Sequence, residues 1–244
     1  MIKATRQQWA NVLLLDAGNA LWSTQPLAVQ SQGKVIIDAM NLMNYNAMVI
    51  GDLDLQWGPE VLRQRIAEAK FPVLSANVVL ATENKLLAQP YALLQVGDRQ
   101  VGIIGLTWDA ASLSSPQSQG KYTLLRAEDV LAKYVAELAK QTDMIIVLSN
   151  MGYDEDMRLS SAVPGIDLIV GGRSRVPMPQ SWRNAQTGTL VVQAGSQGEW
   201  IGRRVLHVNS TGVVTRYEDE LIYLTDDFAD DPEMRAFLDN YKVQ

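Results

Sequence analysis

Five aliphatic stretches of this sequence each run into a loop that contains glycine together with short polar or charged side chains. These loops cover residues 16–19, 51–54, 149–152, 171–175 and 194–196. If the stretches are parallel strands, their carboxyl ends share one edge of a sheet, which is where α/β proteins bind ligands. The loops offer carboxylates, amides and two guanidinium groups. Carboxylate and amide oxygens bind cations, whereas arginines bind anions or pair with carboxylates.

Other catalytic chemistries are excluded by residue type. The chain has no cysteine, which excludes disulfides, thiolate metal sites and cysteine nucleophiles. Its single histidine, His207, falls in a predicted strand beyond the five loops, and we interpret it as an ordinary strand residue. Without a base beside a hydroxyl group, a serine triad is not expected. No glycine-rich phosphate-binding motif occurs, so a nucleotide loop is not predicted either.

The composition is that of a globular protein. The 244 residues suffice for one large domain or two small ones, and 47% of them are hydrophobic. Acidic residues outnumber basic ones by 27 to 21, and the net charge of −6 argues against nucleic-acid binding. No stretch reaches the roughly 18 apolar residues of a membrane helix, and the first residues lack a signal-peptide pattern. We therefore expect neither a nucleic-acid partner nor membrane insertion by this chain.

Aliphatic runs alternate with helical patterns, which predicts an α/β protein with a largely parallel sheet covered on both faces. The predicted buried strands are residues 12–15, 47–50, 72–76, 144–148, 166–170 and 190–193. The predicted helices lie near residues 35–43, 59–69, 127–140 and 231–241. Two hairpins add antiparallel strands, one around Gly97-Asp98 and one around Ser210-Thr211-Gly212.

Seven stretches of the sequence, taken in order, resemble one enzyme family. They are residues 13–18, 40–47, 51–58, 71–77, 101–107, 152–156 and 193–202. Two of them read LLLDAG and FPVLSAN. From about Asn11 to Tyr241 the chain resembles the catalytic domain of the 5′-nucleotidase and UDP-sugar hydrolase branch of the calcineurin-like metallophosphoesterases.

The resemblance implies a fold and a domain organisation. The fold is an α/β/β/α four-layer sandwich with mixed sheets, in which the family's first strand is missing. Residues 1–228 would form the metallophosphoesterase-like domain and residues 229–244 a C-terminal helix, with the family's C-terminal nucleotide-binding domain absent. A missing strand would leave an unpaired edge beside residues 12–15, and we expect a partner or a rearranged N-terminus to cover it.

The resemblance also implies two divalent metal ions, but the residues at the family's ligand positions are poor ligands. These positions fall on Asn19, Asp52, Leu53, Asn150, Arg173 and Arg175. Leucine offers no lone pair, and arginine stays protonated and has no acceptor atom. We therefore expect no metal, no other cofactor and no catalytic residue. The chain is interpreted as a pseudoenzyme that binds other protein subunits in a larger assembly.

Two alternatives remain open. A single metal ion could bind at Asn19, Asp52 and Asn150 and support residual hydrolysis of phosphoesters such as 5′-nucleotides. Arg173 and Arg175 could instead bind a small anion or a nucleotide, while an internal ion pair with Asp52 is the simpler interpretation. Relatives in this branch are usually secreted or periplasmic, so the resemblance implies an extracytoplasmic location.

Overall fold

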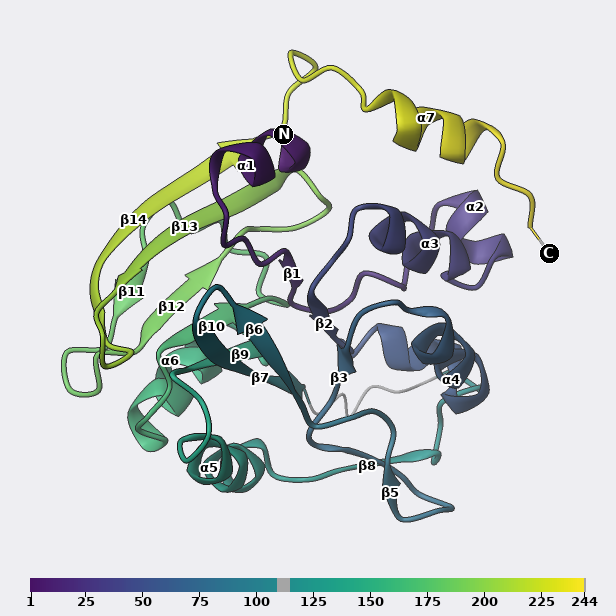
Figure 1. The fold of residues 1–244 in the computed structure, drawn as a ribbon. Coiled ribbons are helices and arrows are strands. Elements are labelled where there is room, and N and C mark those ends of the chain that lie inside the picture. Colours follow the sequence, from purple (N-terminus) through teal and green to yellow (C-terminus); the bar gives the residue numbers. More distant parts are fainter. Residues whose placement is uncertain (109–114, 244) are drawn as a thin grey trace.

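The computed structural model describes residues 1–108 and 115–243, and Figure 1 shows their arrangement. Two β-sheets lie at the centre, with helices on the outer face of each. The first sheet is parallel and has the order β1 (Leu15–Asp16), β2 (Ala47–Val49), β3 (Val73–Leu74). The second sheet is mixed and has the order β11 (Trp182–Arg183), β12 (Leu190–Gln193), β10 (Leu168–Gly171), β9 (Met144–Asn150), β7 (Arg99–Thr107), β6 (Tyr91–Val96).

Shorter sheets and the helices complete the fold. A small antiparallel sheet contains β5 (Lys85–Leu86), β4 (Val78–Leu80) and β8 (Tyr122–Leu124). A long hairpin is formed by β13 (Trp200–Val208) and β14 (Val214–Tyr223). The helices are α1 (Ile2–Gln8), α2 (Pro26–Gln30), α3 (Lys34–Leu42), the 3-10 helix η1 (Asp54–Trp57), α4 (Pro59–Glu68), α5 (Ala127–Leu138), α6 (Tyr153–Ala162) and α7 (Pro232–Asp239).

The first sheet is buried on both faces, which explains why its strands are aliphatic at every position of β2 and β3. Side chains alternate between the faces of a strand. In and just after β2, Ala47 and Val49 belong to the core between the two sheets, whereas Met48 and Ile50 belong to the core beneath α3 and α4. The four residues 47–50 therefore contribute side chains to two hydrophobic cores.

The second sheet follows the same rule. Ile103 and Ile146 pack between the sheets, whereas their neighbours Ile104 and Val147 pack against α5 and α6. Three cores thus separate four layers of helix, sheet, sheet and helix. The α/β/β/α architecture with mixed sheets is confirmed.

The N-terminal segment does not form a strand beside β1. Among the described strands β1 pairs only with β2, and the chain before it forms α1. Arg6 of α1 donates to the carbonyl oxygens of Met43 and Asn44, each at 2.6 Å. This helix lies near the end of the β13–β14 hairpin (Figure 1). The outer edge of β1 is therefore unpaired within the part of the chain that the structure describes.

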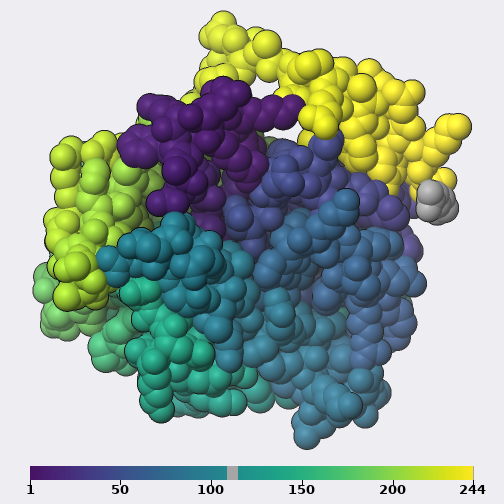
Figure 2. Space-filling model, viewed as in Figure 1, coloured from purple at the N-terminus to yellow at the C-terminus, as the bar shows by residue number. Residues whose placement is uncertain are grey.

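The C-terminal helix lies close to the N-terminal one in space. Asp231 caps α7 by accepting the N–H groups of Glu233 and Met234, and it also forms an ion pair with Lys3 at 2.7 Å. The N-terminal segment (purple) and the C-terminal segment (yellow) lie on the same side of the molecule (Figure 2). None of the helices in residues 1–108 and 115–243 is long and apolar enough to cross a membrane.

Candidate functional site

Side chains from three of the predicted loops form one hydrogen-bonded cluster beyond the carboxyl ends of β1, β2 and β9. Asn19 donates from Nδ2 to Oδ1 of Asp52 over 2.9 Å, and its own Oδ1 accepts the Leu53 N–H at 2.8 Å. Oδ1 of Asn150 accepts the Asp52 N–H at 2.9 Å, and its Nδ2 donates to the Ala17 carbonyl at 3.2 Å. Both amide oxygens are thus bonded to backbone N–H groups.

The loop after β10 adds the positive charge of Arg173 to this cluster. Its Nε lies 3.4 Å from Oδ2 of Asp52, and its guanidinium carbon lies 4.2 Å from the centre of the Trp108 ring. The Asp52 side chain is 13% exposed and that of Arg173 is 35% exposed, so the ion pair is only partly shielded from water. An arginine over a tryptophan face gains a further cation–π attraction. The internal ion pair inferred from the sequence is confirmed for Arg173.

Two of the predicted site residues take no part through their side chains. Arg175 is exposed and forms no ion pair with any described residue, although it stands only two positions after Arg173. Leu53 is half-buried and contributes only its backbone N–H to the cluster. Residues two positions apart on a loop thus have different surroundings, which sequence spacing alone does not reveal.

Three of the site residues have left-handed backbone conformations, which asparagine tolerates but which are unfavourable for arginine. The φ angles are +65° for Asn19, +65° for Arg173 and +58° for Arg175. Such conformations cost about 1–3 kcal/mol each and cluster at functional sites. Close packing adds a second constraint, because a Cβ atom on Gly51 would lie 2.0 Å from Oδ1 of Asn19. The loops therefore keep a strained, closely packed geometry.

Asp54 holds the loops after β1 and β2 together through hydrogen bonds to their backbone N–H groups. It is fully buried, and its Oδ2 accepts the N–H groups of Asn19 at 2.9 Å and Gly51 at 2.8 Å. Its Oδ1 accepts those of Leu21 at 2.9 Å and Trp22 at 3.1 Å. Burial raises the pKa of Asp54 to about 6, because the loss of water outweighs the stabilisation of the anion by these four donors. The carboxylate acts as a structural anchor.

A second buried carboxyl group, Asp156, connects the other loops. It is bonded to the hydroxyl of Ser149 at the end of β9, and its Oδ2 accepts from Nε2 of Gln193 at 3.5 Å. Gln193 in turn accepts the Ser174 hydroxyl at 2.9 Å, and the Ser174 oxygen accepts the Tyr153 N–H at 2.9 Å. Burial raises the pKa of Asp156 to about 8. This chain of bonds fixes the loop that carries the two arginines.

Sequence reasoning missed the role of Asp156. It gave no reason to separate this residue from its neighbour Glu155, yet Asp156 is fully buried. Asp156, Leu159 and Ser160 are spaced i, i+3 and i+4, so they share the buried face of α6. This helical spacing is the sequence feature from which the burial of Asp156 could have been predicted.

The fifth predicted loop reaches the site through a neighbouring residue. Gln193, the last residue of β12, contacts Asp156 and Ser174. Ala194 forms an isolated antiparallel bridge with Pro177, which follows the loop that carries Arg173 and Arg175 (the arginine loop). A Cβ atom on Gly195 would lie 2.9 Å from the Trp200 ring. Residues 194–196 thus support the arginine loop and add no side chain to the cluster.

His207 lies where the sequence predicted, on β13 and away from the loops. It is exposed, and its Nε2 lies 3.1 Å from Oε1 of Glu218 on β14. It cannot serve as a base for any group in the cluster. Within residues 1–108 and 115–243, no three histidines or acidic residues are grouped so that they could hold a metal ion.

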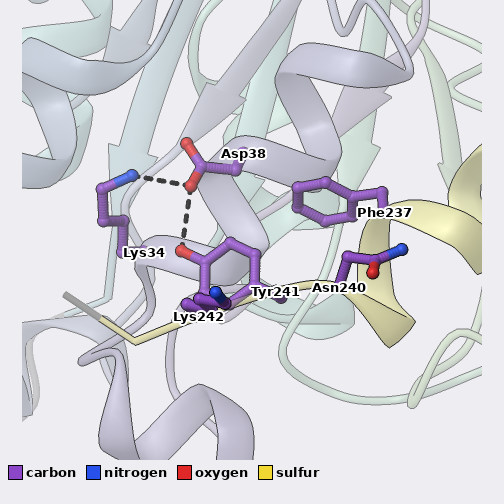
Figure 3. A pocket seen from close by; sticks show the side chains of 6 residues that line it. All are labelled: Lys34, Asp38, Phe237, Asn240, Tyr241 and Lys242. Carbon is purple, nitrogen blue, oxygen red and sulfur yellow. Dashed lines mark hydrogen bonds and ion pairs between the residues drawn. The ribbon is translucent and has the colours of Figure 1, made fainter.

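A surface cavity of about 370 Å³ lies apart from this cluster, between α3 and α7 (Figure 3). Its lining residues are Lys34, Asp38, Phe237, Asn240, Tyr241 and Lys242. Oδ2 of Asp38 accepts from Lys34 at 2.7 Å and from the Tyr241 hydroxyl at 2.9 Å. The bonds attach the end of the chain to α3, and none of the predicted site residues takes part.

Known proteins resemble this chain in both sequence and structure. No family model matches it. Human 5′-nucleotidase is 29% identical over 269 residues, which cover 100% of this chain and 46% of the human protein. The crystal structure of a 5′-nucleotidase precursor from Thermus thermophilus is 30% identical with a TM-score of 0.87, over 97% of this chain and 50% of that one. The calcineurin-like phosphoesterase YfkN from Bacillus subtilis shares the fold with a TM-score of 0.82 at 21% identity, over 98% of this chain and 85% of that one.

The chain spans about half the length of the human protein and of the Thermus structure. The similarity extends over nearly all of this chain. The resemblance seen in the sequence is therefore confirmed, and the chain carries a 5′-nucleotidase-family domain.

Proposed function

We propose that this domain is a non-catalytic member of its family that serves as a structural or binding subunit of a larger assembly. The observation that carries the proposal is the bonding among Asn19, Asp52, Asn150 and Arg173. At the positions where the resemblance implies metal ligands, these residues bind one another. The cluster is thereby satisfied without a metal ion.

The oxygen atoms of the cluster do not fit two divalent ions. Those of the two asparagines accept N–H groups, and the Asp52 carboxylate faces an amide group on one side and a guanidinium group on the other. A metal ion would have to displace these partners. Two unit charges ~4 Å apart repel by roughly 4 kcal/mol at an effective dielectric constant of 20, and a divalent ion beside Arg173 would be repelled more strongly.

Hydrolysis would also need an activated water molecule. In metal-dependent phosphoesterases the metal lowers the pKa of that water and stabilises the charge that develops. Leu53 and Arg175 supply neither a metal ligand nor a base. The one histidine lies on the distant hairpin. We therefore assign no catalytic residue and no cofactor to the domain.

Metal content and phosphoesterase activity test this proposal together. The purified chain would be incubated with Mn²⁺ or Zn²⁺, analysed for bound metal, and assayed with 5′-AMP and an aryl phosphate. We expect less than stoichiometric metal and the same background hydrolysis in the wild type and in Asp52→Ala. Stoichiometric metal with turnover that Asp52→Ala abolishes would overturn the proposal in favour of a residual hydrolase.

A second candidate function, the binding of a small anion, is favoured by one observation. Arg175 is exposed and has no ionic partner among the described residues, and it follows Arg173 on the same loop. A phosphate or carboxylate group could bind there through bidentate hydrogen bonds. A thermal shift with inorganic phosphate that disappears in Arg175→Ala and persists in Arg216→Ala, an exposed arginine of β14, would support it. No shift, or the same shift in both variants, would exclude it.

We also propose that the protein acts outside the cytoplasm. The support is the family resemblance; the cysteine-free sequence is compatible with either side of a membrane. Fractionation of the natural host with an antibody against the chain checks this location. Recovery of the chain only with cytoplasmic markers would contradict it.

A further inference from the structure

The strand β6 forms one edge of the second sheet and has an unpaired side. It pairs with β7 alone among the described strands. The β6–β7 hairpin lies on the near face of the molecule in Figure 1. An edge strand presents a row of free backbone N–H and C=O groups to which another strand can bind.

Hydrogen bonds around the hairpin show which backbone groups face the open side. The Pro90 carbonyl accepts the Gly105 N–H from the β7 side, whereas the preceding carbonyl, of Gln89, accepts Ser75 N–H from the opposite side. Gln100, which stands opposite Gln95, exchanges its bonds with Asp143 and not with β6. Backbone groups alternate in direction along a strand. The N–H and C=O groups of residues 91, 93 and 95 therefore point away from β7.

The open edge lacks the features that keep other edges unpaired. Natural edge strands are protected by charged side chains, proline or β-bulges. The sequence of β6 is YALLQV, without a charge or a proline, and its register with β7 is continuous from Tyr91 to Val96. Leu93, at its centre, is 40% exposed. The strand is thus suited to pairing along its free side.

We propose that β6 pairs with β6 of a second copy of this chain, antiparallel about a twofold axis at Leu93. In this register Leu93 lies opposite Leu93 of the other copy, and Tyr91 lies opposite Gln95. All the outward-facing N–H and C=O groups of these three residues then find partners, and no charge faces a like charge. Any other antiparallel register of two copies leaves some of these groups unpaired.

The twofold arrangement favours a second copy over an unrelated peptide. A closed, isologous interface needs a surface that is complementary to itself. The uncharged strand β6 meets this requirement. The pairing would join the two second sheets into one continuous sheet. One strand pair buries less than the roughly 1,200 Å² of a standard interface, so the dimer is weak and depends on concentration. This pairing does not depend on the function proposed above.

Two charge variants test the contact and its register. Sedimentation equilibrium of the wild type should show dimers whose fraction rises with protein concentration. Leu93→Lys and Leu93→Glu should each raise the dissociation constant at least about tenfold, because like charges then face each other at the axis. An equimolar mixture of the two variants should restore dimers, since opposite charges meet only if residue 93 faces residue 93.

The control is Val213→Lys, which places the same charge on a residue that is 55% exposed in the β13–β14 turn and should leave dimerisation unchanged.

Hydrogen exchange of the wild type tests the same contact without any variant. Exchange at the N–H groups of residues 91, 93 and 95 should slow as concentration rises, while that of residues 92, 94 and 96 should not change. A wild type that stays monomeric up to about 1 mM, or a mixture that fails to dimerise, would overturn the proposal.

Discussion

Nε of Arg173 lies 3.4 Å from Oδ2 of Asp52, although the two residues are 121 positions apart in the sequence. This contact joins the two sheets at the strand ends, because Asp52 follows β2 of the first sheet and Arg173 follows β10 of the second. The guanidinium group of Arg173 thereby places a permanent positive charge within the cluster.

Removal of the Arg173 guanidinium is expected to destabilise the fold only slightly. An ion pair with partly exposed partners contributes about 1 kcal/mol or less. Arg173→Ala should lower the free energy of unfolding by that amount in urea. Arg173→Lys should recover only part of the loss, because an ammonium group cannot stack as a plane on Trp108. Full recovery by lysine would show that the stacking contributes nothing.

Asp54 is expected to matter far more for stability than Asp52. Asp54→Asn replaces one acceptor oxygen by an amide N–H₂ group, which leaves two of the four bonded backbone N–H groups without an acceptor, either those of residues 19 and 51 or those of residues 21 and 22. We predict a loss of about 3 kcal/mol in the free energy of unfolding. Asp52→Asn, on the same loop but partly exposed, should lose about 1 kcal/mol. Equal losses in the two variants would contradict the role of Asp54 as the anchor.

Relief of backbone strain at Arg175 is expected to stabilise the protein. Its φ of +58° is unfavourable for arginine, and its side chain has no ionic partner among the described residues. Arg175→Gly removes the strain but makes the unfolded chain more flexible, so the net gain should be about 0.5–1 kcal/mol. Arg175→Ala, which removes the side chain and keeps the strain, should give no gain. A gain from alanine as large as that from glycine would show that the arginine side chain, and not the backbone conformation, destabilises the protein.

Much of the fold could be predicted from the sequence, because the evidence for it is local. Continuous aliphatic runs such as residues 47–50 and 144–148 indicate strands buried on both faces, and both runs are such strands. The Gly97-Asp98 turn and the helix capped by Asp231 were equally visible. The order of the strand-end loops also located the cluster around Asp52.

The rest depends on contacts between distant parts of the chain. Arg173 and Arg175 have the same side chain and similar positive φ angles, yet only Arg173 lies beside both Asp52 and Trp108. The burial of Asp156 depends on where β12 ends, since Gln193 contacts it from there. No local pattern encodes either contact. The N-terminal helix α1 has no buried residue, so it lacked the apolar face by which a helix is predicted.

The pH dependence of stability should show the buried carboxyl groups. Burial raises the pKa of Asp156 to about 8, against an ordinary value of 3.8. Between these values the unfolded chain releases the proton while the folded protein keeps it, so the unfolded state binds fewer protons. The group's contribution to stability is therefore complete below about pH 4 and is lost as the pH rises to about 8, with a slope of up to about 1.4 kcal/mol per pH unit.

Urea unfolding of the wild type and of Asp156→Asn at several pH values measures this contribution. Asparagine has no titrating group, so the variant should lose this part of the slope and become more stable relative to the wild type as the pH rises. Burial also raises the pKa of Asp16 to about 7, so a decline of the same sign should persist in the variant up to about that pH. Between about pH 7 and pH 8 the Asp156 contribution is then isolated. Parallel curves for the two proteins in that interval would show that Asp156 is already ionised in the folded state.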